Sequence, residues 1–248
     1  SSIPVAPRKG MILLVAFLLG LIFPAGVLYL RFIINNKVRG RKDIESYTSL
    51  PFLGEIPRYE TLSLHHRIIP KIFRTKESER RLRQKERQKN ILLFNAKERV
   101  VISEAFTVVR TNLAYMLHGI ESKGKVLMTT CAIPESGKTF ISANFSSCLA
   151  SLEGNRVLLI DADIRKASLS DALASYMTQR SKGGLSSYLL GGSTDLSDLI
   201  VRIDASSPFD FLPAGVVPPN PTELLLGDRF AELIDKVRDM YDYILIDS

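Results

Sequence analysis

The chain has 248 residues, a hydrophobic content of 46% and a formal net charge of +7, so it can form one substantial folded domain with appendages. Residues 35–100 hold 17 basic and 8 acidic residues, whereas residues 101–248 hold 13 basic and 18 acidic. A nucleic-acid-binding protein usually carries its positive charge on the folded domain, so this distribution disfavours nucleic acid and favours membrane lipid as a partner. Cys131 and Cys148 form no C-x-x-C pair, which argues against a disulfide framework or a zinc motif.

Residues 11–30 contain no charged side chain, and a helix of this length matches a hydrocarbon core of about 30 Å. A signal peptide is the alternative, but its apolar region is shorter and needs a small-residue cleavage site that is missing here. Basic residues are more frequent after this segment than before it, so we expect its C-terminal side to be cytoplasmic. We predict a transmembrane helix in residues 11–34, preceded by an extracytoplasmic remnant in residues 1–10 of a longer protein.

Residues 35–100 are predicted to form a cytoplasmic juxtamembrane linker. Residues 43–57 indicate a short helix or turn and then an extended segment around two prolines and a glycine. Residues 71–90 are densely charged, which is typical of a solvated linker or a mixed-charge helix; adhesion to anionic lipid is the alternative. Residues 103–117 have the apolar spacing of an amphipathic helix, with Ser103 as its expected N-cap.

Residues 125–139, KVLMTTCAIPESGKT, are the most informative stretch of the chain. An apolar run leads into a loop ending in Gly-Lys-Thr, and residues 140–150 have the spacing of a helix, which is the order of a phosphate-binding loop. Ala132 stands where the common pattern has its first glycine. Backbone N–H groups of such a loop have no intrahelical partner and attract phosphate. The charge of Lys138 would contact the β- and γ-phosphates, and the hydroxyl of Thr139 would bind Mg2+. The expected nucleotide-binding residues are Pro134, Glu135, Ser136, Gly137, Lys138, Thr139 and Phe140.

Acidic residues follow two further predicted strands. An apolar run at residues 156–160 leads into Asp161, Asp163 and Arg165, and residues 241–248 form an apolar strand that ends in Asp247. Because parallel strands share one edge at their carboxyl ends, these groups should lie near the phosphate loop; a simple strand-ending turn at Asp161 is the alternative. The expected catalytic residues are Lys138, Asp161, Asp163 and Arg165, and the expected Mg2+ ligands are Thr139, Asp161 and Asp247.

Together these elements predict an α/β fold with a P-loop, doubly wound and mostly parallel sheet in residues 101–248. Between the acidic positions we expect a helical region at 183–192, a strand at 209–212, a proline-rich loop with a helix starting near Pro221, and a helix at 231–240. We expect the sheet to be incomplete at the C-terminus, and this chain to have little activity by itself.

Several motifs in one order resemble those of the bacterial tyrosine kinases (BY-kinases) of capsular and exopolysaccharide export. They are FLGEIP at 52–57, SEAF and RTNL within 103–113, the phosphate loop, LLIDADIRK at 158–166, LPAG and PPNPTELL within 212–225, and ILIDS at 244–248. Residues 103–113 are similar to the family's subunit-contact motif, with Thr107 in place of its first arginine.

The resemblance implies a membrane-anchored, ATP- and Mg2+-dependent protein tyrosine (auto)kinase of the bacterial inner membrane, with its kinase domain in the cytoplasm. Its implied partners are like subunits, which it phosphorylates in trans, and the polysaccharide polymerisation and export machinery. Asp161 would be the base or Mg2+ organiser and Asp247 the Walker B acid. Two alternatives stay open: a non-catalytic, nucleotide-binding co-polymerase scaffold, and a partition-type ATPase switch, which often has an extra loop lysine that is missing here.

Overall fold

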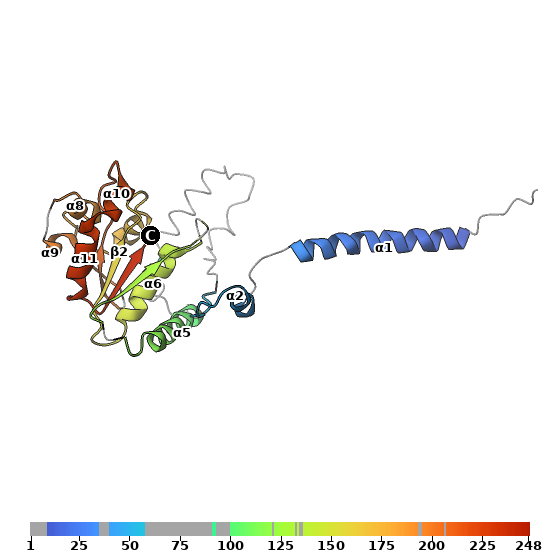
Figure 1. Ribbon diagram of the computed structural model, residues 1–248, viewed down its shortest axis with the longest axis horizontal. Helices are drawn as coiled ribbons and strands as arrows, with labels where there is room; N and C mark the ends of the chain where they lie inside the picture. The colour runs from blue at the N-terminus through green and yellow to red at the C-terminus, as the bar shows by residue number, and fades with distance from the viewer. Residues whose placement is uncertain are drawn as a thin grey trace, which may run out of the picture. The chain divides into compact units, whose positions relative to one another are not determined.

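The computed structural model describes residues 9–34, 40–57, 91–92, 100–120, 122–131, 133, 136–192, 195–205 and 207–248. The chain divides into two compact units, Ser1–Phe52 and Leu53–Ser248 (Figure 1). Four of the predicted features lie outside the described residues: the remnant before residue 9, the charged segment at 71–90, Pro134 and Glu135.

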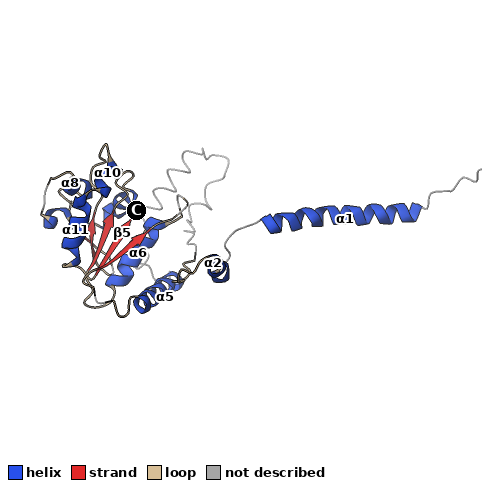
Figure 2. Cartoon of the chain, in the orientation of Figure 1, coloured by secondary structure: helices blue, strands red, loops and turns tan. Residues whose placement is uncertain are grey.

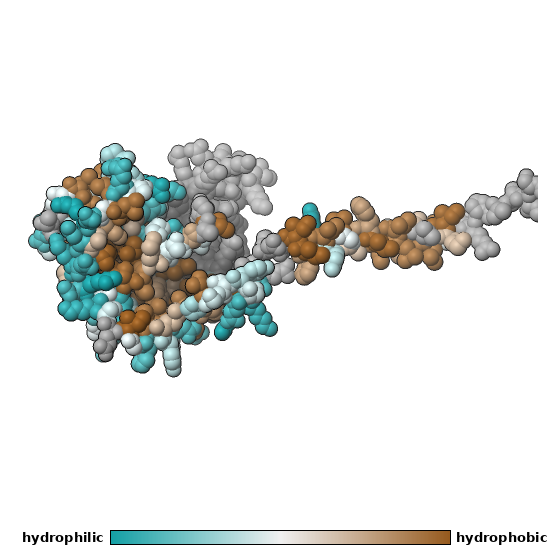
Figure 3. Space-filling view, viewed as in Figure 1, coloured by the Kyte–Doolittle hydropathy of each residue, from teal (hydrophilic) through white to brown (hydrophobic). Residues whose placement is uncertain are grey.

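The first unit contains one long helix, α1, at Lys9–Ile34, with Pro24 inside it. Its stretch Gly10–Ile34 is long and apolar enough to cross a membrane, and the face seen in Figure 3 is mostly hydrophobic. The short helix α2, at Arg41–Tyr47, is followed by extended chain, as residues 43–57 predicted. Arg41 and Glu45 lie one turn apart on α2 and form an ion pair of 2.6 Å.

The second unit is built on a five-stranded sheet with the order β1-β5-β2-β4-β3. The strands are β1 Lys125–Thr129, β2 Val157–Asp161, β3 Val201–Ile203, β4 Phe209–Leu212 and β5 Tyr243–Asp247. The first four strands in this order are parallel, and only the edge strand β3 is antiparallel to its neighbour. This confirms the predicted mostly parallel α/β sheet. The register aligns Thr129, Asp247 and Asp161 at the carboxyl ends of three adjacent strands.

Helices cover both faces of the sheet, because alternate strand residues point to opposite sides. Leu158 and Ile160 of β2 pack with residues of the helices on one face, whereas Leu159 packs on the other. The first face carries α8 Leu185–Leu189, α9 Leu196–Leu199, α10 Pro221–Leu226 and α11 Asp228–Arg238. The second face carries α6 Lys138–Ala150, α7 Ser168–Leu173 and the 3-10 turn η2 Ala174–Tyr176. Figure 2 shows the sheet between these two layers.

A further helix, α5 at Val100–Met116, packs on the outer side of α6. Phe106 is buried with Cys148 of α6, and Ile56 from the extended segment packs on the same cluster. That segment is also held by a hydrogen bond of 2.8 Å from the Asn112 side chain to the carbonyl of Leu53. Part of the expected linker therefore packs against the folded domain.

The predicted N-cap at Ser103 is wrong, because α5 begins one turn earlier, at Val100. Burial of Ile102 in the cluster favours this longer helix. Arg110 lies further along α5 and donates hydrogen bonds of 2.8 Å to the Cys148 carbonyl and to the Ser151 hydroxyl. It therefore holds the C-terminal end of α6 within the same chain.

Candidate nucleotide-binding site

The phosphate loop joins β1 to α6, as the sequence predicted. Gly137 has φ of 98° and ψ of 16°, a left-handed conformation that glycine adopts readily, and α6 begins at the next residue, Lys138. The N–H groups in the first turn of α6 lack intrahelical partners and can bind phosphate oxygens. Ser136 is exposed at the loop, whereas the Phe140 ring packs 6.2 Å from the Phe106 ring. Phe140 can therefore offer the loop only its backbone.

Three side chains of α6 reach the carboxyl end of β5. Thr139 Oγ1 donates to Asp247 Oδ2 at 3.1 Å, and Ser142 Oγ donates to Asp247 Oδ1 at 2.9 Å. Lys138 Nζ donates to the main-chain carbonyl of Ser248. The predicted loop lysine and threonine thus meet the predicted acid at the end of β5.

Asp161 ends the neighbouring strand β2 and is fully buried. Its Oδ2 accepts hydrogen bonds from the backbone N of Ser170 at 2.9 Å and from the Ser170 hydroxyl at 2.6 Å. Its Oδ1 accepts from the backbone N of Asp163 at 3.2 Å. Burial raises the pKa of Asp161 from 3.8 to about 6. The hydrogen bonds from Ser170 and Asp163 lower this pKa, and the negative charge of Asp247 adds a smaller increase.

Asp247 is nearly as buried as Asp161, and the two residues are partners in the β2–β5 register. Burial raises the pKa of Asp247, and the hydroxyls of Ser142 and Thr139 and the positive charge of Lys138 oppose this rise. Two adjacent buried carboxylates repel one another, so a cation bound between their strand ends would stabilise both.

The other two predicted catalytic residues lie beside this pair. Asp163 is half-buried, and its Oδ1 accepts a hydrogen bond of 3.3 Å from the backbone N of Lys166. Arg165 is exposed in the turn that follows β2. The turn ends at Ala167, whose φ of 48° makes it the one non-glycine residue with positive φ among the described residues. A left-handed alanine is strained, and such strain persists only where surrounding contacts fix the backbone.

Ser142 and Ser170 were missed from the sequence, although each donates to a buried carboxylate. Ser142 lies four residues after Lys138, so helical spacing alone places both side chains on one face of α6. Ser170 carried no comparable signal, because the turn at Ala167 is what brings it to Asp161.

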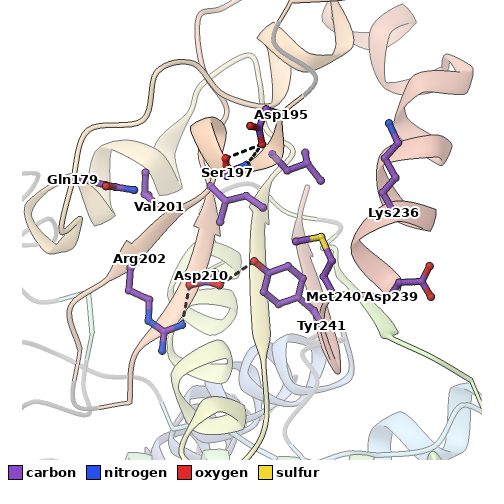
Figure 4. Close-up of a pocket in the computed structure, with 12 residues that line it drawn as sticks. Gln179, Asp195, Ser197, Val201, Arg202, Asp210, Lys236, Asp239, Met240 and Tyr241 are labelled. Atoms are coloured by element: carbon purple, nitrogen blue, oxygen red, sulfur yellow. Dashed lines mark hydrogen bonds and ion pairs between the residues drawn. The ribbon is translucent and has the colours of Figure 1, made fainter.

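A separate concavity of about 780 Å³ lies between α9, the start of β4 and α11 (Figure 4). In it the Tyr241 hydroxyl donates to Asp210 at 2.9 Å, and Asp210 forms an ion pair of 2.8 Å with Arg202. Asp210 lies near the start of β4 and Tyr241 lies two residues before β5, whereas the phosphate loop and the two buried acids lie at the opposite, carboxyl ends of the strands. This concavity contains none of the predicted site residues.

The site residues fit a magnesium ion bound together with phosphates. Mg2+ is usually held by one or two carboxylates, phosphate oxygens and water rather than by an all-protein cage. Thr139, Asp161 and Asp247 offer one hydroxyl and two carboxylates at neighbouring positions. In the part of the chain that the structure describes, no group of three or more His, Cys, Asp or Glu side chains forms a metal site by itself.

The fold and the loop define a P-loop α/β domain, a class whose architecture implies nucleotide binding. Residues 135–248 match the family description of an AAA domain.

Known tyrosine kinases match the chain over a longer range. It is 31% identical to the tyrosine-protein kinase etk of Escherichia coli over 99% of its own length, and 31% identical to the tyrosine-protein kinase wzc of Salmonella typhimurium over 98%. The chain spans 32% and 31% of the lengths of these two relatives. The kinase domain of E. coli ETK superposes with a TM-score of 0.65 and 30% identity, over 85% of this chain and 73% of that one. The chain belongs to the bacterial tyrosine kinase family.

Proposed function

We propose that the chain is the nucleotide-binding part of a membrane-anchored, ATP-dependent protein tyrosine kinase that regulates capsular or exopolysaccharide polymerisation and export. Its relatives etk and wzc are named tyrosine-protein kinases. The observation that carries the proposal is the pair of buried acids, Asp161 and Asp247, aligned at the strand ends beside Thr139. A folded domain keeps two such costly groups together when function requires them.

The chain's own residues supply binding, orientation and charge. Backbone N–H groups at the start of α6 would hold the β-phosphate, and Lys138 would leave the Ser248 carbonyl to contact the β- and γ-phosphates of ATP. Bound Mg2+ would neutralise phosphate charge, and Thr139, Asp247 and Asp161 are the residues that would hold it. Asp161 would either help to hold this Mg2+ or accept the proton of the attacking tyrosine hydroxyl.

The first test is calorimetry of ADP binding to the detergent-solubilised chain with Mg2+ and with EDTA. We expect magnesium-dependent binding in the wild type and a loss of at least tenfold in affinity in Lys138→Met, which keeps a long side chain but removes its charge. Arg238→Met on the last turn of α11 is a matched control and should bind as the wild type does. Equal binding by wild type and Lys138→Met would contradict the proposed site.

The second test separates a kinase from a scaffold or an ATPase switch. The full-length protein is incubated with ATP and Mg2+, and phosphotyrosine and free phosphate are measured. A kinase yields phosphotyrosine that Lys138→Met abolishes. Nucleotide binding without phosphotyrosine would instead support a co-polymerase scaffold, and phosphate release without phosphotyrosine would support an ATPase switch.

The proposal places α1 across the bacterial inner membrane, with the second unit in the cytoplasm, where ATP is available. The length and apolar composition of α1 support this placement. The proposed partners are like subunits, phosphorylated in trans, together with the polysaccharide export machinery and membrane lipid. Extraction of bacterial membranes at alkaline pH should leave the protein in the pellet; release into the supernatant would contradict a spanning α1.

A further inference from the structure

Ser170 donates two hydrogen bonds to the same carboxylate oxygen of Asp161. Its backbone N and its hydroxyl both donate to Asp161 Oδ2, at 2.9 and 2.6 Å. The other oxygen, Oδ1, accepts a longer hydrogen bond of 3.2 Å from the backbone N of Asp163. The carboxylate plane is therefore fixed by contacts to Oδ2, and Oδ1 has more capacity left to accept a further donor or cation.

The Ser170 hydroxyl also accepts a hydrogen bond of 2.9 Å from the backbone N of Ala214, in the loop after β4. That loop is itself anchored, because the carbonyls of Pro213 and Ala214 accept hydrogen bonds of 2.8 and 3.0 Å from Leu185 and Ser186 at the start of α8. The hydroxyl therefore connects the end of β2 to a hydrogen-bonded segment beyond the end of β4. A side chain that donates and accepts at once is needed for this connection.

The backbone before α7 is shaped for this contact. The carbonyl of Asp163 accepts hydrogen bonds from the backbone N atoms of Lys166 and Ala167, which closes a turn. Ala167 then adopts its left-handed conformation, and α7 starts at the next residue, with Ser170 in its first turn. Asp161 thus accepts a hydrogen bond from the backbone N of Ser170 in the first turn of α7, as a helix-capping residue does, although Asp161 lies nine residues before Ser170.

We propose that Ser170 is a positioning residue for Asp161, and this inference rests on the nucleotide-dependent function proposed above. By holding Oδ2, its hydroxyl orients Oδ1 toward the shared edge of the sheet, where Asp247 and the phosphate loop lie. Second-layer partners of this kind typically change metal affinity by tenfold to a hundredfold when they are removed. Ser170 acts through Asp161 and does not contact the nucleotide itself.

The test compares Ser170→Ala, Ser170→Thr and Ser168→Ala, each in the detergent-solubilised chain. Calorimetry measures ADP affinity across a range of Mg2+ concentrations and in EDTA, and urea unfolding checks that each variant is folded. Ser168 is an exposed serine on the same helix and is the matched control.

We expect Ser170→Ala to lower the affinity for ADP with Mg2+ by about tenfold, with ADP affinity in EDTA within twofold of wild type. Ser170→Thr keeps the hydroxyl and should restore affinity to within about threefold, and Ser168→Ala should match the wild type. Equal loss with and without Mg2+, or no loss in Ser170→Ala while the wild type binds, would overturn this inference alone. A wild type without magnesium-dependent binding would overturn the proposed function and this inference with it.

Discussion

Replacing the buried carboxylate of Asp161 with an amide should stabilise the protein when Mg2+ is absent. The pKa of Asp161 is raised by burial from 3.8 to about 6, so the folded state binds its proton more tightly than the unfolded state does. The contribution of this carboxyl to the stability of the folded state is therefore greatest below about pH 4, and it is lost as the pH rises through about 6. A difference of about 2 pKa units corresponds to about 3 kcal/mol at neutral pH.

Asp161→Asn removes this charge but loses one of the hydrogen bonds that the carboxylate accepts, at a cost of about 1 kcal/mol. We expect a net gain of about 2 kcal/mol in the free energy of unfolding at pH 7.5 in EDTA, and a loss of about 1 kcal/mol at pH 4, where the wild-type carboxyl is already neutral. The same variant should lose magnesium-dependent ADP binding, because the amide cannot replace a carboxylate near the metal.

The assay is urea unfolding in detergent between pH 4 and 7.5. Tyrosine fluorescence is the monitored signal, because the chain contains no tryptophan. Asp235→Asn makes the same chemical change on the exposed side of α11 and should stay within about 0.5 kcal/mol of wild type. An Asp161→Asn variant that is less stable than wild type at pH 7.5, or whose difference from wild type is the same at every pH, would refute this reasoning.

Three further substitutions test local packing by urea unfolding. Ala167→Gly should stabilise the protein by about 0.5–1 kcal/mol, because glycine adopts φ of 48° without strain. Destabilisation would show that the contacts of the alanine Cβ contribute more than the strain costs. Gly184→Ala should destabilise by about 1–3 kcal/mol, since its Cβ would lie 2.5 Å from the backbone N of Gly215; wild-type stability would contradict this close approach. Ser142→Ala should cost about 1–3 kcal/mol, because it removes a hydroxyl that donates to the buried Asp247, and an unchanged midpoint would mean that this bond contributes nothing.

Two controls match these substitutions. Ser147 lies on the same helix as Ser142, and its buried hydroxyl has no hydrogen-bond partner among the residues that the structure describes, so Ser147→Ala should be neutral or stabilising. Gly227 has φ of −76° and its added Cβ would meet neighbours only at 3.5 Å or more, so Gly227→Ala should stay near wild-type stability.

Local sequence signals predicted the phosphate loop and its flanking elements. Gly137 and Lys138 stand between an apolar run and a helical pattern, and each of these three features is set by near neighbours in the chain. The acids at the ends of β2 and β5 were predicted for a related reason, because buried parallel strands are continuous apolar runs whose ends are visible.

Features that depend on distant contacts were not predictable in this way. The edge strand β3 has only three residues and is defined by its pairing with β4, where Arg202 forms an ion pair with its register partner Asp210. The contact of Ser170 with Asp161 depends on the strained turn at Ala167, and alanine gives no hint of a left-handed conformation. The start of α5 was misjudged because a serine that could cap a helix occurs one turn inside it.

The contacts of the extended segment at residues 53–57 with α5 determine which part of the domain would first bear a mechanical force on the chain. Leu53 is hydrogen-bonded to Asn112, and Ile56 packs on the aromatic cluster that also receives Phe140, two residues after the phosphate-loop lysine. A force on the chain before Leu53 would thus act on the Leu53–Asn112 hydrogen bond and on the packing of Ile56 near Phe140 before it reached any strand of the sheet. The contacts of Leu53 and Ile56 are therefore the first that such a force would have to break.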